Sequence, residues 1–209
     1  MKCRRNASWL VALAIGWLVG PFVQAESCVQ DLVGDDPAAM TVLTNDYIKV
    51  SLDGCLAMDF DTALDILQRP DLLDEAQRAY AELLPEGETA EFQVQRMTTN
   101  RFYYINRKQQ RADVAELYRG QSSQDLLEMV FHSRGKRFFG PFQALIHIRT
   151  KRTGSENVDY TVDVYAYPER AAPRFFSRHL RLLERVFRSK SRDVRRMLTG
   201  ICKHLYTDD

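Results

Sequence analysis

The sequence has little of what would place the protein in a special class. Its 209 residues include only 10 glycines, 7 prolines and 4 cysteines, and the formal net charge is +1. One long hydrophobic run occurs, and there is no internal repeat or low-complexity segment. These absences exclude a collagen-like chain, a disordered chain and a polytopic membrane protein. A length of 209 residues with 45% hydrophobic content favours a single globular domain.

Recognisable catalytic and cofactor motifs are also missing. No GxSxG, HExxH, P-loop or GxGxxG pattern occurs in the chain. The four histidines are His132, His147, His179 and His204, and no two have the i, i+4 spacing of a helical metal pair. We therefore expect no metal site and no cofactor.

The first 25 residues have the pattern of a secretory signal peptide. A basic start at residues 2–5 precedes an apolar run at 9–23, which is short for a membrane span of about 20 residues. Val23 and Ala25 supply the small residues that precede a cleavage site. We predict a periplasmic or secreted protein whose mature chain begins at Glu26. The alternative is an N-terminal segment that is kept as a membrane anchor.

Export would leave three cysteines in an oxidising compartment, where one disulfide is expected. The predicted pair is Cys28–Cys55, which would tie an N-terminal arm (residues 26–45) to the first strand. The alternative pair is Cys55–Cys202. Three cysteines at these spacings do not form a zinc site.

The periodicity of apolar residues predicts the order of elements from residue 46 onward. Alternation at 47–52 predicts a strand. Two short helices follow, the first capped by Asp61 and interrupted by Pro70, the second over 71–84. A long amphipathic helix is expected from about Pro173 to Tyr206. Between the helices, strands are expected near 91–97, 101–106, 111–119, 125–133, 142–152 and 157–167.

Two details of this middle region carry alternatives. The apolar residues in 125–133 also suit a helix, so that segment is the least certain strand. Residues 153–157 form the clearest hairpin turn, with Gly154 available for a positive φ. On the strand after this turn, alternation lets Asp159 and Asp163 share an exposed side.

This order of elements resembles the helix-grip superfamily, also called START-like or SRPBCC. The resemblance covers residues 46–206 and rests on topology and element lengths. It implies an α+β fold in which a curved antiparallel sheet of six or seven strands wraps a long C-terminal helix, as one domain over 46–209. It also implies a hydrophobic ligand site between sheet and helix, although the same side chains would equally fill a plain core. The lining would be Ile146, Ile148, Tyr160, Val162, Leu180, Leu183 and Phe187.

Charge is distributed unevenly along the chain after the signal segment. Residues 26–92 hold 16 acidic and 3 basic side chains, whereas residues 93–209 hold 12 acidic and 23 basic ones. On the predicted last helix, arginines recur every three or four residues, as Arg174, Arg178, Arg181, Arg185, Arg188, Arg192 and Arg195. Like charges at this helical spacing repel one another. We expect the repulsion to be offset either by acidic residues of the same chain or by an anionic membrane surface or envelope protein. The candidate acidic residues are Asp71, Asp74, Glu75 and Glu82.

The segment 134–142 is a second candidate for contact with an anionic partner. It combines Arg134, Lys136 and Arg137 with three phenylalanines. Bases and aromatics together are typical of a loop that meets an anionic, partly apolar surface. The alternative is a β-turn whose phenylalanines fold inward. Nucleic acid is not an expected partner for an exported protein.

Three functions remain after these exclusions. The first is an exported, non-enzymatic protein that binds a hydrophobic or amphipathic ligand such as a lipid. The second is a protein-interaction module of the cell envelope that uses the basic helix face. The third is an enzyme on the same scaffold, which a cavity with a buried, paired Asp, Glu or His would favour.

The export hypothesis predicts a processed N-terminus at Glu26. Sequencing the N-terminus of protein recovered from the periplasm or medium is expected to begin Glu26-Ser27-Cys28. Ala25→Leu is expected to block processing because the last residue before the cleavage site must be small, whereas Gln24→Leu is expected to be processed normally. An N-terminus at Met1 in the wild-type protein would contradict the hypothesis.

Overall fold

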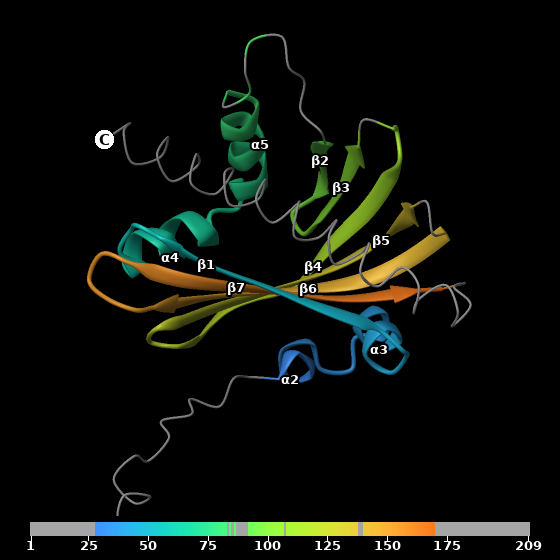
Figure 1. Ribbon diagram of the computed structural model, residues 1–209, viewed down its shortest axis with the longest axis horizontal. Helices are drawn as coiled ribbons and strands as arrows, with labels where there is room; N and C mark the ends of the chain where they lie inside the picture. The colour runs from blue at the N-terminus through green and yellow to red at the C-terminus, as the bar shows by residue number, and fades with distance from the viewer. Residues whose placement is uncertain are drawn as a thin grey trace, which may run out of the picture.

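Seven antiparallel strands form one twisted sheet in the computed structural model, which describes residues 28–82, 84, 86, 92–106, 108–137 and 140–169 (Figure 1). The strand order is β1-β7-β6-β5-β4-β3-β2, so the first strand pairs with the last and the remaining strands follow as a meander. The predicted α+β fold with an antiparallel sheet is confirmed. The predicted long helix after Pro173 lies outside the described residues.

The strands agree with the predicted segments, and several are longer than predicted. β5 and β6 extend toward the turn between them, because their pairing continues from Leu126↔Lys151 to Arg137↔Gly140. The bounds are β1 (Ile48–Leu56), β2 (Phe92–Thr98), β3 (Arg101–Asn106), β4 (Arg111–Ser123), β5 (Leu126–Arg137), β6 (Gly140–Arg152) and β7 (Val158–Pro168).

The segment at 125–133 is a strand, so its helical interpretation is wrong. β5 pairs with β4 on one side and with β6 on the other, and tertiary pairing therefore decides a pattern that was locally ambiguous. The hairpin turn between β6 and β7 is confirmed, and Thr153 N–H donates to the Asn157 carbonyl. Gly154 does not use a positive φ there. In the described residues the glycines that do are Gly34 and Gly140.

Two helices lie between β1 and β2, as predicted. α4 (Phe60–Gln68) is capped by Asp59 and not by Asp61, because the Asp59 carboxylate accepts from Thr62 N–H at 2.8 Å. Asp61 instead lies in the first turn and accepts from Arg152 at 2.8 Å. Pro70 follows the end of α4, and α5 (Leu72–Glu82) resumes after it.

The N-terminal arm contains two helices that periodicity did not indicate. α2 (Val29–Val33) has five residues and α3 (Pro37–Leu43) has seven, lengths that are marginal for an isolated helix. Asp36 caps α3, and its carboxylate accepts from Ala38 and Ala39 N–H at 2.9 Å each. The arm therefore depends on the sheet beneath it for most of its stability.

Helices cover the sheet from both sides (Figure 1). On one side α4 packs over Leu127 and Val158, and Leu67 and Leu73 reach Phe102, Met129 and Phe131. On the other side α2 and α3 pack over Val130, Leu145 and Tyr165. We call these sides the α4 face and the arm face. In the described part of the chain, no helix is long and apolar enough to cross a membrane.

A close approach on the α4 face makes glycine necessary at position 54. Gly54 of β1 pairs with Tyr160 of β7, and the Tyr160 ring lies over it so closely that a Cβ would overlap the ring. Tyr160 is buried, so its ring would have to displace neighbouring side chains to make space for a Cβ. Gly54 is therefore a packing requirement of the sheet edge.

We expect Gly54→Ala to lower the free energy of unfolding by about 1–3 kcal/mol, the usual cost of overpacking. Without the clash, alanine would stabilise a strand by up to about 1 kcal/mol relative to glycine, so the sign of the change is informative. Urea unfolding measures it. Gly154→Ala is the control, because a Cβ added at position 154 would have no neighbouring atom within 4 Å. Tyr160→Val should relieve part of the Gly54→Ala loss, and additive effects of the two changes would contradict this account.

Candidate ligand surface and a buried polar row

Aliphatic side chains form a continuous surface across three strands of the α4 face. Strand alternation sends every second residue of β1, β7 and β6 to this side. Several of these side chains stay partly exposed, whereas on the arm face of β6 and β7 Leu145, His147 and Asp163 are buried. We call this set the aliphatic surface; its members are Ile48, Val50, Leu52, Ile146, Ile148 and Val162.

The described members of the predicted ligand lining all lie on this face. Ile146, Ile148 and Val162 belong to the aliphatic surface, and Ile146 and Ile148 also pack against the Phe102–Met129–Phe131 core. Tyr160 faces the same way but is buried over Gly54, so it serves as a wall of the core. The other three predicted lining residues, Leu180, Leu183 and Phe187, lie outside the described residues.

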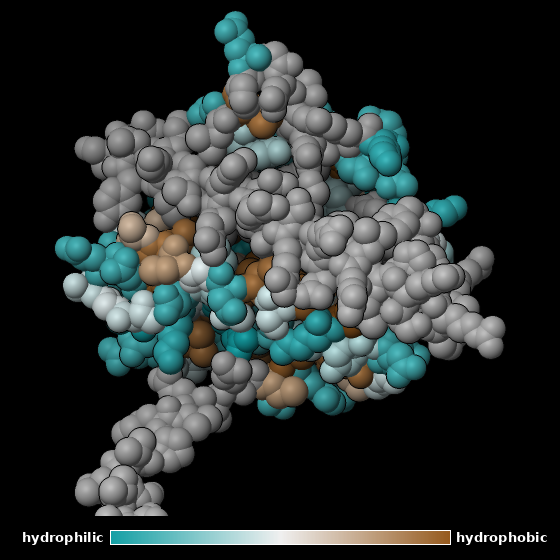
Figure 2. All heavy atoms as spheres, viewed as in Figure 1, coloured by the Kyte–Doolittle hydropathy of each residue, from teal (hydrophilic) through white to brown (hydrophobic). Residues whose placement is uncertain are grey.

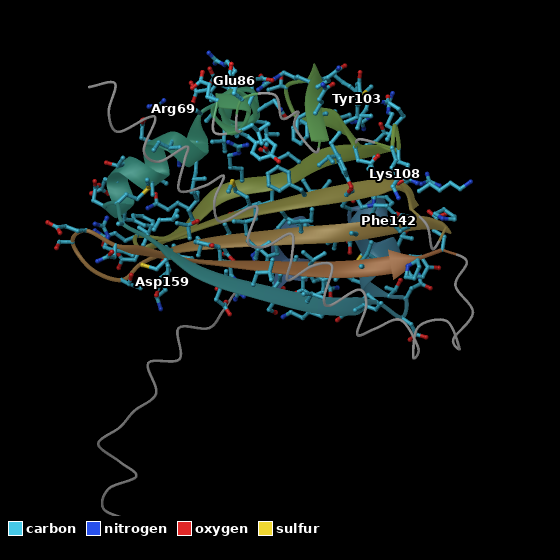
Figure 3. All side chains as sticks on the ribbon, turned by 45° about the horizontal axis from the view of Figure 1, so that its top comes forward. Arg69, Glu86, Tyr103, Lys108, Phe142 and Asp159 are labelled. Atoms are coloured by element: carbon cyan, nitrogen blue, oxygen red, sulfur yellow. The ribbon has the colours of Figure 1, made fainter. Side chains whose placement is uncertain are left out.

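One ion pair stands on the α4 face beside this surface. Arg119 of β4 donates to both carboxylate oxygens of Glu116, with Nε at 3.0 Å from Oε1. Its Nη1 also donates to the carbonyls of Leu67 at 2.6 Å and Arg69 at 3.2 Å, at the end of α4. Figure 3 shows Arg69 where α4 meets α5. Arg119 therefore links the end of α4 to the sheet through hydrogen bonds. The positive charge of Arg119 is neutralised by the carboxylate of Glu116.

The arm face carries a row of hydrogen-bonded polar side chains that crosses five strands and is buried on the three middle ones, β5, β6 and β7. At its centre, His147 of β6 lies 2.9 Å from Glu128 of β5, measured from Nε2 to Oε1. His147 is 2% exposed and Glu128 is 0% exposed. Ser122 of β4 donates to the other oxygen of Glu128. A buried carboxylate is costly unless it is hydrogen-bonded, and these contacts provide that compensation.

The row continues through Asp163 of β7, which is 2% exposed. Its carboxylate accepts from Ser51 of β1, from Arg149 of β6 at 2.8 Å and from Lys49 of β1 at 3.1 Å. Burial by itself would raise the pKa of Asp163, but these hydrogen bonds and the two positive charges hold the pKa below its ordinary value. Asp163 is therefore ionised at neutral pH.

This position corrects the expectation that Asp159 and Asp163 share an exposed side. Only Asp159 is exposed, and Figure 3 shows it near the hairpin end of the sheet, far from Phe142. Asp163 pairs with Ser51 and His147 midway along β7, where the side chains of Ser51, Lys49 and Arg149 contact its carboxylate. Alternation correctly placed both residues on one face. It could not show that this face is covered.

His132 of β5 and His147 of β6 lie on the same face of neighbouring strands. They are not directly opposite each other, since His132 pairs with Leu145 and His147 pairs with Val130. His132 is hydrogen-bonded to Gln143 at 3.0 Å, and Gln143 donates to Glu169. Burial lowers the pKa of both histidines below the ordinary value, outweighing the hydrogen bonds that would raise it. Among the described residues no three ligating side chains gather in a way that would hold a metal ion.

The predicted anionic-contact residues are only partly described. Arg134 is exposed and lies 3.4 Å from Glu169, and Lys136 is also exposed. The side chain of Arg137 and the arginines of the predicted last helix lie outside the described residues. On the face seen in Figure 2, hydrophobic residues of the described part appear as separate patches among hydrophilic ones.

The predicted Cys28–Cys55 disulfide is wrong, since both cysteines are free and exposed. Cys28 caps α2, which contacts β4 and β5, whereas Cys55 lies near the end of the edge strand β1. Three strand spacings separate β1 from β5, or about 14 Å, which exceeds the span of a disulfide. The alternative partner, Cys202, lies outside the described residues.

Comparison with solved structures identifies the fold. A conserved protein from Geobacillus kaustophilus superposes with a TM-score of 0.50 at 11% identity, over 77% of this chain and 96% of that one. Norcoclaurine synthase from Thalictrum flavum, in complex with dopamine and hydroxybenzaldehyde, gives 0.47 at 11% identity, over 81% and 92%. A START superfamily protein from Mycobacterium smegmatis gives 0.42 at 11% identity, over 77% and 99%.

The fold is START-like. The predicted resemblance is thus confirmed at the level of fold, and identities near 11% show no more than that. No protein-family model matches the chain, and no curated protein matches its sequence. The function must therefore be argued from the START-like sheet itself.

The polar row on the arm face is the feature that sequence reasoning missed. Its residues carry one weak signal, since polar side chains recur at every second position of β6 and β7 at the same level of the sheet. That pattern normally marks a solvated face. The arm and the neighbouring strands make it a buried one.

Asp163→Asn tests whether the buried charge matters. Removing one partner of a buried ion pair leaves the other charges uncompensated, so we expect a loss of about 3–5 kcal/mol in the free energy of unfolding at pH 7. Asp159→Asn, on the same strand but exposed, should change it by less than about 0.5 kcal/mol.

The same variants have an expected pH dependence. The folded-state pKa of Asp163 is below the unfolded value, so its contribution is complete above about pH 4 and is lost as the pH falls further. The difference between wild type and Asp163→Asn should therefore shrink in acid, as measured by urea unfolding from pH 7 to 3. Equal small effects of the two substitutions would contradict the assignment.

Proposed function

We propose that the protein is exported and binds a hydrophobic or amphipathic ligand, such as a lipid, against the aliphatic surface, without catalysing a reaction on it. The observation that carries this proposal is the partial exposure of six aliphatic side chains on one face of β1, β7 and β6. The export part rests on the N-terminal sequence pattern.

The chemistry of the aliphatic surface supports an apolar ligand. A contiguous set of aliphatic side chains gains free energy when it is covered by apolar groups, at roughly 25 cal/mol per Å² removed from water. Such patches commonly mark binding sites. The arginines on that face are paired with carboxylates, Arg119 with Glu116 and Arg152 with Asp61 and Asp125, and the aliphatic surface itself has no charged member.

The location of the buried titratable groups supports a binding role over an enzymatic one. An enzyme on this scaffold would be favoured by a buried, paired acid or histidine that faces the ligand. In the described residues, the buried pair His147–Glu128 and the buried Asp163 point to the arm face, on the other side of the sheet from the aliphatic surface. They stabilise the protein from a side that the proposed ligand does not touch.

The envelope-interaction hypothesis remains as the alternative, and one observation favours it. Two of the four acidic residues expected to neutralise the predicted arginine row have other partners: Asp74 lies 2.9 Å from Arg96, and Glu75 lies 3.6 Å from Arg69. An anionic membrane surface or envelope protein would then supply the remaining negative charge.

A bound ligand and a blocked surface provide the test. Native mass spectrometry of protein purified without detergent is expected to show a co-purified apolar molecule. After delipidation, the protein should bind a fluorescent fatty-acid probe. Ile148→Phe and Val162→Phe should weaken probe binding by about 5- to 150-fold, equivalent to the 1–3 kcal/mol typical of overpacking.

Lys151→Phe is the matched control for these variants. Lys151 is an exposed residue near the end of β6 and faces away from the aliphatic surface, so the same ring added there should leave probe binding unchanged. Equal binding by all variants, or no binding by the wild type, would refute the ligand proposal. Selective flotation of the ligand-free protein with anionic vesicles at low salt would then support the envelope alternative.

A further inference from the structure

The arm packs over two neighbouring residue pairs of β5 and β6, each of which joins one apolar residue to one buried histidine. On β5 and β6, Val130 lies directly opposite His147, and His132 lies directly opposite Leu145. Val130 and Leu145 are 0% exposed and form the floor against which the arm residues Val29, Ala39 and Val42 pack. We call these four residues of the sheet the histidine bed. It holds both histidines of the described part of the chain.

The arm is held by apolar contacts with this bed and with the tyrosines beside it, chiefly Tyr165. Helices of five and seven residues do not persist alone in water, so α2 and α3 depend on the apolar contacts beneath them. A charge that appears in the bed therefore acts on the element with the least stability of its own.

Several charged groups near the two imidazoles influence whether these rings are protonated. His132 faces Asp36 of α3, which favours its protonated form, and Arg134 of β5, which opposes it; Gln143 of β6 bonds to its ring. His147 faces Glu128 of β5 and Asp163 of β7, which favour the protonated form, and Arg149 of β6, which opposes it.

Burial outweighs the favourable neighbours at both sites, so both histidines keep a pKa below the ordinary value while the arm is docked. Release of the arm exposes the bed to water and returns the two imidazoles toward their ordinary pKa of about 6.5. The docked state thus binds fewer protons than the released state at mildly acidic pH.

We propose that the N-terminal arm, residues 28–43, is a pH-sensitive cover that is docked on the histidine bed at neutral pH and is released from it in mild acid. The direction follows from proton linkage. Docking is unaffected above about pH 6.5 and weakens as the pH falls from there toward the docked pKa, by up to tenfold for each histidine and each unit of pKa difference. Release exposes Val130, Leu145 and Tyr165, an apolar patch on the face opposite the proposed ligand surface.

The mature chain offers a clean optical test, because the only tryptophans of the sequence, Trp9 and Trp17, precede residue 26. Leu32 of α2 and Leu43 of α3 are partly buried against the arm core, so Leu32→Trp and Leu43→Trp each place a single reporter on the arm. Leu64→Trp places the matched reporter on α4, on the other face. Emission is recorded from pH 8 to 4.5 on the mature protein, with far-UV circular dichroism as a measure of the sheet.

The expected result is a shift of emission to longer wavelength in both arm reporters, with a midpoint below pH 6.5. The Leu64→Trp emission and the circular dichroism should stay constant over that range. Adding His132→Gln and His147→Gln should abolish the shift, because glutamine retains hydrogen-bonding ability without titrating in this range. Each single replacement should move the midpoint part of the way, so the single variants provide the same test where the double variant does not fold.

Three results would overturn the proposal. They are constant emission from the arm reporters down to pH 4.5, an unchanged shift in the glutamine variants, and a simultaneous shift of Leu64→Trp with loss of circular dichroism. The third result would mean that acid unfolds the whole protein. The arm and the aliphatic surface lie on opposite faces, so these outcomes are independent of ligand binding.

Discussion

The structure depends on the alternation of side chains in one seven-stranded antiparallel sheet that has helices on both faces. Successive residues of β1, β5, β6 and β7 point to opposite sides, and the unbroken register of these strands keeps each side consistent. Irregularities interrupt the alternation in β4 and at the end of β2. A slip of one residue in β6 would exchange Ile146 and Ile148 for Leu145 and His147. The separation of an aliphatic surface from a polar row is therefore a consequence of register.

The two faces are stabilised by different means. The α4 face is largely apolar, and arginines of the sheet tie its helices down: Arg119 joins β4 to the end of α4, and Arg152 joins β6 to Asp61 in the first turn of α4. The arm face buries charge in its middle, where Glu128 and Asp163 would be costly without their hydrogen-bonded partners. Such a network favours one strand register over its neighbours, because any shift would leave a buried carboxylate without its donors.

The two faces of the sheet therefore differ in their chemistry. The aliphatic surface can gain contacts with an apolar molecule without disturbing any buried ionic group. The arm face holds the buried carboxylates and histidines of the described residues, and it is covered by the two shortest described helices. The buried carboxyl and imidazole side chains of the described residues, Glu128, His132, His147 and Asp163, all lie on the arm face.

The sequence by itself determined the order of the described elements from β1 onward, the strand positions to within a few residues, and the START-like resemblance, because these follow from local periodicity. Alternation also placed Ile146, Ile148 and Val162 on one face. Tertiary structure decided the rest. It made 125–133 a central strand, gave the α4 cap to Asp59, separated Cys28 from Cys55 and buried His147, Glu128 and Asp163. Periodicity states which residues share a face, but burial depends on what packs against that face, and that is settled by contacts between segments far apart in the chain.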